Sequence, residues 1–320
     1  MRRIFVYESL SGGGQLDADA AHLLAQGRQM RDALVADLLC VPDLAVTCAV
    51  SQGAGLPVAH ERLSGATPGP GEEAPAFVQR LAHQHDLAWI VAPENDGLLG
   101  ALHEAVGAPR WIGCDAETIR VASSKRATLL ALAAQRVPTP LDFAEPMSGR
   151  WVVKPDDGAG AVHTRVHANH DAALADLRLR RSAGTSATLE PFVEGEALSI
   201  SMLAAPGFVQ PLTFNQQAIV IDADGWLNDI GVRSNVIDSR SDPRAVRLHT
   251  LALDVKRALP GLRGYVGIDL VWHAERGPVV IEVNPRLTSA YVGLSNALGR
   301  NLAEEVLLLH GLPEVADAAQ

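Results

Sequence analysis

Apolar and polar positions in the first third of the chain alternate in short blocks. Three apolar runs have the length of β-strands, and they lie at residues 4–7, 45–50 and 87–92. Longer amphipathic segments separate or follow them and predict helices at residues 17–39, 72–85 and 98–106. A β-α-β-α order is typical of a mainly parallel sheet, whose ligand-facing loops follow the carboxyl ends of the strands. The Gly- and Pro-rich stretch at residues 64–71 predicts a surface loop.

From about residue 115 the pattern changes to isolated helices among strand-like runs. Ser123-Ser124 offers an N-cap for a helix over residues 125–135. Further helices are predicted at residues 171–181, 243–259 and 295–309. Strands are predicted at residues 151–154, 188–193, 198–204, 208–215, 218–221 and 226–232. We therefore expect an α/β unit over residues 1–114, a small α+β unit over 115–187 and a larger unit over 188–320.

The apolar runs at residues 265–272 and 277–286 read as the two strands of a hairpin. A turn centred on Glu275-Arg276 opposes apolar residues on one face, namely Ile268, Leu270 and Trp272 with Val283, Ile281 and Val279. On the other face Asp269 lies opposite Glu282, with Asn284 two residues along. Opposed carboxylates destabilise a sheet unless a cation lies between them, and Mg²⁺ prefers oxygen ligands together with substrate phosphates. The pattern favours a magnesium–nucleotide site over the alternative, a solvent face that carries acids.

Two lysines upstream of the hairpin add a candidate phosphate site. Lys154 ends a predicted strand and precedes a glycine loop, in the order Lys154-Pro-x-x-Gly158-x-Gly160. An ammonium and the backbone N–H groups of such a loop can surround phosphates. Because the lysine precedes the glycines, this is not a P-loop. Lys125 begins a predicted helix earlier in the chain. The alternatives are an ordinary strand exit for Lys154 and a solvated surface lysine for Lys125.

A strand–turn–strand segment over residues 189–201 is a candidate adenine site. Its backbone N–H and C=O groups could hydrogen-bond an adenine edge, and Phe192 and Val193 would supply apolar walls. A carboxylate, Glu190 or Glu196, would bind the ribose or the adenine amino group. The alternative is a plain hairpin with exposed acids.

Composition narrows the function classes. The 320 residues allow two or three packed units, and 48% hydrophobic residues allow a substantial core. A net charge of −10 and only 4% aromatic residues argue against nucleic-acid binding. The three cysteines show no metal-binding spacing, and their odd number suggests a reducing compartment. Because the start is not signal-like and no apolar run reaches about 18 residues, we expect a cytoplasmic protein without a membrane segment.

The order and spacing of these motifs together resemble the ATP-grasp enzymes. The resemblance spans about residue 115 to residue 312, and the preceding α/β segment is similar to the domain that normally comes before the grasp. It implies an α/β and α+β protein, in which a Rossmann-like pre-ATP-grasp domain precedes two ATP-grasp subdomains that hold ATP between them. The roles it implies are phosphate contacts for Lys125 and Lys154, a flexible lid for Gly158 and Gly160, an adenine hinge for residues 190–193, and a Mg²⁺ or Mn²⁺ site for Asp269, Glu282 and Asn284.

The chain departs from the family pattern at three positions. Ala197 stands where a ribose-binding glutamate is common, with Glu196 one position earlier. Gly267 stands in place of the arginine often found two residues before the first metal aspartate, so Arg233 or Arg286 would have to stabilise the charge of the reacting groups. Ala161 ends the glycine loop in place of the usual serine.

Within that superfamily, three stretches resemble the tyramine–glutamate ligases of methanofuran biosynthesis. These stretches are residues 7–13, 92–97 and 284–294. The likeness implies glutamate as the activated acid and tyramine or tyrosine as the amine.

Acidic residues follow two predicted strands of the parallel sheet, where such sheets bind ligands. They are found in Glu8-Ser9 and in Glu94-x-Asp96, and an acidic pair there would hold the ammonium of an amine substrate. An arginine, Arg233 or Arg286, would hold a carboxylate. The alternative is that Glu94 and Asp96 only cap the helix that begins near residue 98.

ATP-grasp ligases form amides through an acyl phosphate, and this is the function that the resemblance implies. Another amino-acid ligase, a carboxylase that phosphorylates bicarbonate, and a nucleotide-binding module without catalysis remain as alternatives. A Rossmann dehydrogenase is a weaker choice, because Ser11-Gly-Gly-Gly14 lacks the Gly-x-Gly-x-x-Gly pattern. Dimers are common in the superfamily, so a homodimer is among the expected states.

Overall fold

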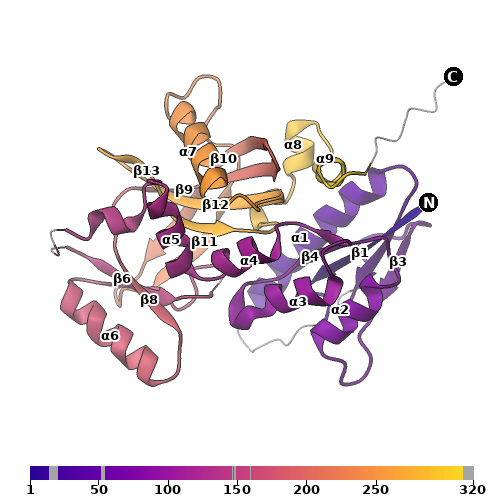
Figure 1. Ribbon diagram of the computed structural model, residues 1–320, viewed down its shortest axis with the longest axis horizontal. Helices are drawn as coiled ribbons and strands as arrows, with labels where there is room; N and C mark the ends of the chain where they lie inside the picture. Colours follow the sequence, from indigo (N-terminus) through magenta and orange to yellow (C-terminus); the bar gives the residue numbers. More distant parts are fainter. Residues whose placement is uncertain (14–20, 52–54, 146, 148, 159, 313–320) are drawn as a thin grey trace.

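The computed structural model describes residues 1–13, 21–51, 55–145, 147, 149–158 and 160–312, and these residues form three sheets. The strand orders are β3-β2-β1-β4-β5, β7-β6-β8 and β11-β10-β9-β12-β13. Figure 1 shows the first sheet with its helices on the right, the small second sheet with α6 on the left, and the third sheet with α7 between them. No helix among the described residues is both long and apolar enough to cross a membrane.

The N-terminal sheet is parallel throughout and covered by helices on both faces. Its strands are β1 (Arg2–Glu8), β2 (Leu44–Ala49), β3 (Leu63–Ala66), β4 (Leu87–Val91) and β5 (Trp111–Ile112). Helix α1 (Ala21–Cys40) covers the face that carries Ile4 and Val6, and α2 (Ala74–Ala82) and α3 (Leu98–Val106) cover the face that carries Phe5 and Tyr7. Because both faces are buried, β1 reads as a continuous apolar run.

The predicted parallel sheet is confirmed, with two omissions. The loop predicted over residues 64–71 is wrong for its first three residues, which lie in strand β3: Ser64 pairs with Thr47 and Gly65 with Cys48. Strand β5 is only two residues long and gave no periodic signal. The predicted start of the first helix, at residue 17, lies outside the described residues.

The small sheet is antiparallel and follows two helices, α4 (Ala116–Ala122) and α5 (Lys125–Ala134). Its strands are β6 (Trp151–Pro155), β7 (Arg165–His167) and β8 (Ala187–Pro191), and α6 (His170–Ser182) packs on it. Ser124 caps α5 by accepting a hydrogen bond from the Ala127 N–H, as predicted. Since β8 pairs with β6, the hydrogen-bonded sheet extends past the proposed boundary at residues 187–188.

The C-terminal sheet is antiparallel and has one apolar and one polar face. Its strands are β9 (Glu196–Ala205), β10 (Phe208–Ile221), β11 (Leu227–Arg233), β12 (Gly264–His273) and β13 (Gly277–Asn284). Helix α7 (Arg244–Ala258) buries Leu248 and Leu251 against Ile200 and Ile268 on the apolar face. The opposite face buries Leu203 and Tyr265 near one end and carries polar side chains, among them Ser199 and Asp269, along the rest.

Two predictions for this region need correction. The strands predicted at residues 208–215 and 218–221 form one strand, β10, with register shifts along it. The helix predicted over residues 295–309 is divided into α8 (Leu294–Leu298) and α9 (Leu302–Leu309). The chain turns at Gly299, whose φ of 64° lies in the left-handed region that favours glycine.

The predicted register of the β12–β13 hairpin is correct where it carries the acids and wrong beyond them. Asp269 lies opposite Glu282, as alternation predicted. Past that pair the register shifts by one, so that Leu270 opposes Val280 and Ile281 is left as the extra residue of a β-bulge. Simple alternation cannot anticipate a bulge, because it assumes one residue against one along the whole ladder.

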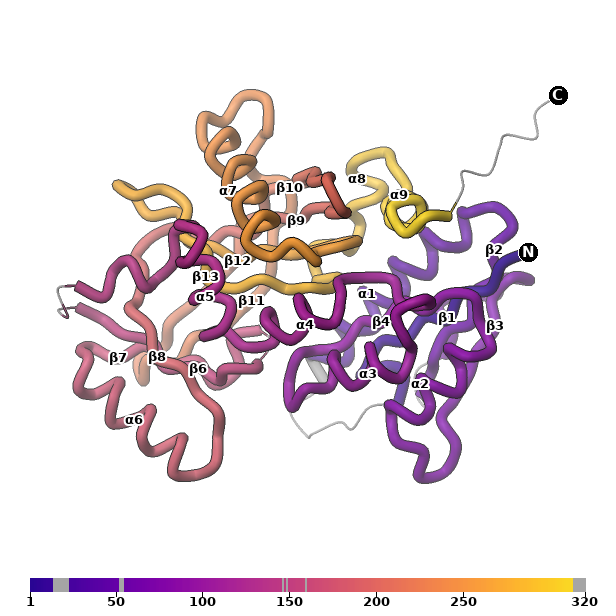
Figure 2. Tube along the Cα trace, in the orientation of Figure 1, coloured from indigo at the N-terminus to yellow at the C-terminus, as the bar shows by residue number. Residues whose placement is uncertain are grey.

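The three parts are joined by contacts between residues distant in sequence. Backbone hydrogen bonds from Val166 to Gly225 (2.8 Å) and from Leu227 to Thr164 (2.9 Å) join the small sheet to the C-terminal sheet. Figure 2 shows the chain returning through α8 and α9 to the side of α1. There the Tyr291 hydroxyl donates a 2.5 Å hydrogen bond to Asp37 of α1.

Candidate functional site

The predicted metal residues meet on the polar face of the C-terminal sheet. The Asn284 Nδ2 donates to Asp269 Oδ2 at 3.1 Å, and the Gln217 Nε2 donates to Asp269 Oδ1 at 2.9 Å. Burial, reinforced by the charge of Glu282, raises the pKa of Asp269 to about 7. The two opposed carboxylates therefore resist carrying two charges together, which is the condition that a bound cation relieves.

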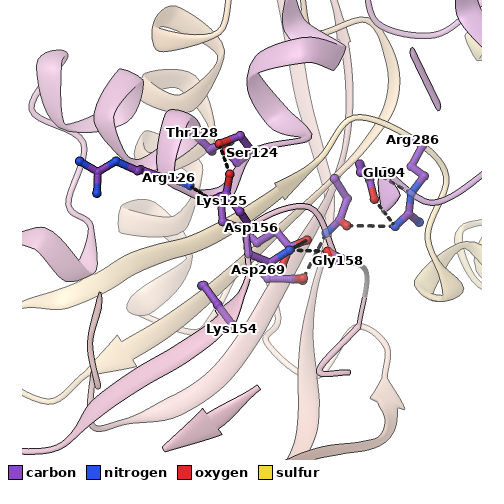
Figure 3. Close-up of polar contacts among 12 residues, drawn as sticks. Glu94, Ser124, Lys125, Arg126, Thr128, Lys154, Asp156, Gly158, Asp269 and Arg286 are labelled. Carbon is purple, nitrogen blue, oxygen red and sulfur yellow. Dashed lines mark hydrogen bonds and ion pairs between the residues drawn. The ribbon is translucent and has the colours of Figure 1, made fainter. Parts of the chain in front are cut away.

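Lys125 extends over these acids from the first turn of α5. Its Nζ lies 3.5 Å from Glu282 Oε1 and donates to the carbonyl oxygen of Gly158. The residue is only 5% exposed, so the solvated-surface alternative is wrong. Figure 3 shows Lys125 between the glycine loop and Asp269, whereas Arg126 points away from them.

Asp156 ties the glycine loop to the start of α5. Its carboxylate accepts hydrogen bonds from the Ser124 hydroxyl at 2.6 Å and from the Arg126 N–H at 2.9 Å. Its carbonyl oxygen accepts from the Lys125 N–H at 2.8 Å. Asp156 was not predicted as a site residue. The available signal was an acid directly after Lys154-Pro155, because acids are favourable near the N-terminus of a helix such as α5.

Lys154 and Glu190 form a buried ion pair on the neighbouring strands β6 and β8. The Lys154 Nζ lies 2.6 Å from Glu190 Oε1, and both side chains are about 5% exposed or less. Glu190 Oε2 is also buried and has no hydrogen-bond partner among the described residues. The site therefore holds an acceptor oxygen that a ligand N–H or O–H group could satisfy.

Glu94 and Arg286 form a second buried pair, between the loop after β4 and the residue just past β13. Arg286 Nε donates to Glu94 Oε1 at 2.9 Å, and Nη2 donates to Glu94 Oε2 at 3.0 Å (Figure 3). Glu94 makes no capping hydrogen bond to the helical turn that follows it, so the capping alternative is wrong for Glu94. This pair also occupies the edge of Arg286 expected to bind a substrate carboxylate.

The Glu8 carboxylate binds the loop that follows β1 and, among the described residues, makes no hydrogen bond or ion pair with the metal residues or the lysines. It accepts hydrogen bonds from the Ser11 N–H at 2.8 Å and the Ser11 hydroxyl at 2.6 Å, and the Ser9 hydroxyl lies 3.4 Å away. A Cβ on Gly27 of α1 would lie 2.6 Å from the Glu8 carboxylate. The structure thus engages Glu8 and Ser9 in local contacts, and substrate binding by them remains a prediction.

Asp96 contributes its backbone where the sequence suggested its side chain. The Asp96 side chain is exposed, and its N–H donates to Asp157 Oδ2 of the glycine loop at 2.9 Å. Its φ of 51° is in the left-handed region. The helix α3 has Gly97 as its N-cap and shows no side-chain capping bond, so the capping alternative fails for Asp96 as well.

The other predicted residues lie around the margins of this group. Arg233 is exposed at the end of β11 and makes no ion pair with the described residues. The ring of Phe192 is covered by the Arg150 guanidinium at 4.1 Å, and Val193 is buried. Glu196 is bound by Arg244 at 2.7 Å. In the glycine loop, Gly158 is buried and Gly160 is exposed with a φ of 63°.

The donor set fits a magnesium ion that is shared with phosphates. No three His, Cys, Asp or Glu side chains among the described residues gather to hold a metal ion by themselves. Asp269 and Glu282 supply two carboxylates, and Asn284 adds an amide oxygen. Mg²⁺ commonly takes one or two carboxylates and completes its shell with waters and substrate phosphates. The number and type of these oxygen donors fit such an ion.

Comparison with known proteins matches two segments of the chain to protein families. Residues 122–290 match the ATP-grasp domain, and residues 44–119 match the pre ATP-grasp 3 domain. A tyramine–L-glutamate ligase of Methanocaldococcus jannaschii is 28% identical over 211 residues. That match covers 65% of this chain and 58% of the ligase, so the chain spans less than two thirds of that relative's length.

Two solved structures share the fold. An ATP-grasp superfamily protein from Archaeoglobus fulgidus has a TM-score of 0.70 at 21% identity, covering 96% of this chain and 88% of that one. The D-alanine–D-alanine ligase of Bacillus anthracis complexed with ATP has a TM-score of 0.65 at 15% identity, covering 97% of both chains.

Proposed function

The chain belongs to the ATP-grasp family, and from this premise we propose that it is an ATP-dependent ligase that joins a carboxylate to an amine. The observation that carries the proposal is the opposition of Asp269 to Glu282 with the Lys125 ammonium 3.5 Å from Glu282. A cation held by these carboxylates, together with the lysine, would compensate the repulsion between two anions, a substrate carboxylate and the terminal phosphate of ATP.

We propose that the nucleotide lies between the small sheet and the C-terminal sheet. Lys125, Lys154 and the loop around Gly158 would bind its phosphates. The unpartnered Glu190 Oε2 would accept from the adenine amino group or the ribose, with Val193 as part of an apolar wall. Asp269, Glu282 and Asn284 would hold Mg²⁺, which supplies neutralisation of the phosphate oxygens. The three-part division of the chain at residues 114 and 187 is part of this proposal, with strand β8 crossing the second boundary to pair with the small sheet.

Two steps would follow. A carboxylate oxygen of the acid attacks the terminal phosphorus of ATP, the bond from that phosphorus to the bridging oxygen of ADP breaks, and ADP leaves. The nitrogen lone pair of the amine then attacks the acyl carbon, the carbon–oxygen bond to phosphate breaks, inorganic phosphate leaves, and the nitrogen loses a proton. A closed glycine loop would keep water from hydrolysing the acyl phosphate.

We propose glutamate as the acid and tyramine or tyrosine as the amine, because the relative with 28% identity is a tyramine–L-glutamate ligase. The ammonium of the amine would be held near the loops that follow β1 and β4. Arg286 would support the charge of the reacting groups, since Gly267 leaves no side chain at the other position.

The experiment is an ADP-release panel with Mg²⁺ and ATP, in which glutamate with tyramine and glutamate with tyrosine are the first wells. We expect ADP only when acid and amine are both present, together with an amide product in the mass spectrum. ADP formed with bicarbonate and no amine would instead indicate a carboxylase. ATP binding without ADP formation across a broad panel would overturn catalysis and leave a nucleotide-binding module.

A further inference from the structure

The loop between β4 and α3 reaches the metal residues through one arginine. Glu94 of this loop binds the Nε and Nη2 of Arg286 at 2.9 and 3.0 Å. Arg286 Nη2 also donates to Asn284 Oδ1 at 3.4 Å, and Asn284 Nδ2 donates to Asp269 Oδ2 at 3.1 Å. A continuous chain of polar contacts therefore runs from the N-terminal sheet to the opposed carboxylates.

Four of the five N–H groups of Arg286 have a hydrogen-bond acceptor. A guanidinium carries five N–H groups. Two are donated to Glu94, one to Asn284 and one to the carbonyl oxygen of Leu287 at 3.3 Å. Because its bidentate edge is occupied by Glu94, Arg286 is better placed to orient its neighbour than to bind a substrate carboxylate through two parallel hydrogen bonds.

The amide of Asn284 is oriented from both sides. A guanidinium faces its oxygen and a carboxylate faces its nitrogen, and neither contact would be favourable if the amide were turned over. A carbonyl oxygen that accepts one hydrogen bond retains a second lone pair, so Oδ1 can still bind a cation. The orientation of this ligand thus depends on where Arg286 is held.

We propose that Glu94 is a positioning residue of the metal site: it acts through Arg286 to orient the Asn284 amide, and it makes cation affinity depend on the docking of the N-terminal sheet. This inference rests on the proposed function, in which Asp269, Glu282 and Asn284 hold Mg²⁺. The pair suits the role because its side chains are only 4% and 11% exposed, so little solvent competes for the guanidinium. Outer partners of metal ligands commonly change metal affinity by about 10- to 100-fold.

The loop between β4 and α3 also forms a hydrogen bond with the glycine loop. Two residues after Glu94, the Asp96 N–H donates to the Asp157 carboxylate at 2.9 Å. Asp96 adopts a left-handed φ of 51°, which is uncommon for a residue other than glycine and marks a conformation that the surrounding structure maintains. One short segment of the N-terminal unit therefore contacts both Arg286, which follows β13, and the loop expected to close over phosphates.

The test compares Glu94→Gln with a matched control. Glu72→Gln removes a bidentate contact of the same geometry but more exposed to solvent, to Arg80 at 2.8 and 2.7 Å, within the same unit and away from the metal residues. Binding of Mn²⁺ in the presence of ADP, followed by electron paramagnetic resonance, reports the site without turnover. We expect about 10- to 100-fold weaker Mn²⁺ binding in Glu94→Gln, partial recovery in Glu94→Asp, and no change in Glu72→Gln.

Glu94→Gln leaves a buried guanidinium without its counter-charge and could unfold the chain. In that case the double variant Glu94→Gln/Arg286→Gln removes both charges together, and weakened Mn²⁺ binding by the folded double variant is the expected result. Unchanged Mn²⁺ affinity in either folded variant overturns the positioning role. Failure of the wild-type protein to bind Mn²⁺ with ADP would instead remove the metal assignment in the proposed function, so the two failures are distinguishable.

Discussion

The Lys125 ammonium lies 3.5 Å from the Glu282 carboxylate, and both side chains are largely withdrawn from solvent. In this arrangement the lysine supplies a positive charge beside two opposed acids. A bound Mg²⁺ would share that task, and the lysine would then be available to a phosphate oxygen. One buried ammonium thus links the helix α5, the glycine loop and the carboxylates of the C-terminal sheet.

Glu282→Gln is expected to abolish ATP-dependent turnover, by on the order of 100-fold or more, because it removes a charge that would neutralise the reacting phosphate through Mg²⁺. The fold should persist, since the amide keeps the shape of the side chain and Lys125 retains its bond to Gly158. ADP release measures the loss, and circular dichroism checks the fold. Glu275→Gln, at the exposed turn of the same hairpin, is the control that should retain activity. Full activity of Glu282→Gln would exclude the metal assignment.

Lys154→Met should destabilise the protein more than its matched double variant. The single substitution leaves the Glu190 carboxylate buried without its counter-charge, and breaking such a pair typically costs about 3–5 kcal/mol. Lys154→Met/Glu190→Gln removes both charges and should recover much of that stability. The free energy of unfolding in urea measures the difference. Equal stability of the single and double variants would show that the pair is not coupled in the folded state.

Much of the fold could be predicted because its signals are local. Helix α5 begins after Ser124 because the serine oxygen satisfies a free N–H group, and that preference is visible in four residues of sequence. The opposition of Asp269 to Glu282 followed from alternation along two strands. The bulge at Ile281 did not, since it depends on packing of the whole sheet rather than on the order of apolar and polar residues.

The sequence predicted which residues make up the site better than it predicted which of them form contacts with one another. Strand ends and spacing identified the lysines, the glycine loop and the acids. The pairing of Glu94 with Arg286 joins residues 192 positions apart and arises only when the N-terminal sheet docks beside β13. The local use of Glu8 is similar, because it depends on the close approach of Gly27 from a neighbouring helix.

Gly27→Ala should destabilise the protein, because the added Cβ would lie 2.6 Å from the carboxylate of Glu8 and must displace a side chain held by the β1 loop. Overpacking of this kind typically costs about 1–3 kcal/mol. Gly100→Ala in α3 is the matched control, since no atom beyond its chain neighbours and the backbone of its own helix lies within 4 Å of its added Cβ, and alanine favours a helix by up to about 1 kcal/mol. Urea denaturation should shift in opposite directions for the two variants, and a stabilised Gly27→Ala would contradict the close packing.

Acidification should weaken the attachment of the C-terminal helix through His310. The Gly113 N–H donates to His310 Nε2 at 3.0 Å, so Nε2 is the acceptor and Nδ1 carries the proton directed at the Val306 carbonyl oxygen, 2.8 Å away. A second proton on Nε2 would oppose the Gly113 N–H. Burial lowers the pKa of His310, and the charge of Arg263 adds to that effect.

A lowered pKa in the folded state means that the unfolded chain takes up the proton first. The stability is therefore complete above the ordinary histidine pKa of about 6.5 and is lost as the pH falls below it, by at most about 1.4 kcal/mol per pH unit for one proton. Burial lowers the pKa of His85 and His103 in the same direction, so the wild-type decline has several contributors. His310→Gln keeps an acceptor for the Gly113 N–H without titrating. Urea unfolding at pH 7.5 and pH 5.5 should give a smaller loss of stability in His310→Gln than in the wild type. An equal loss in both proteins would remove His310 from the pH response.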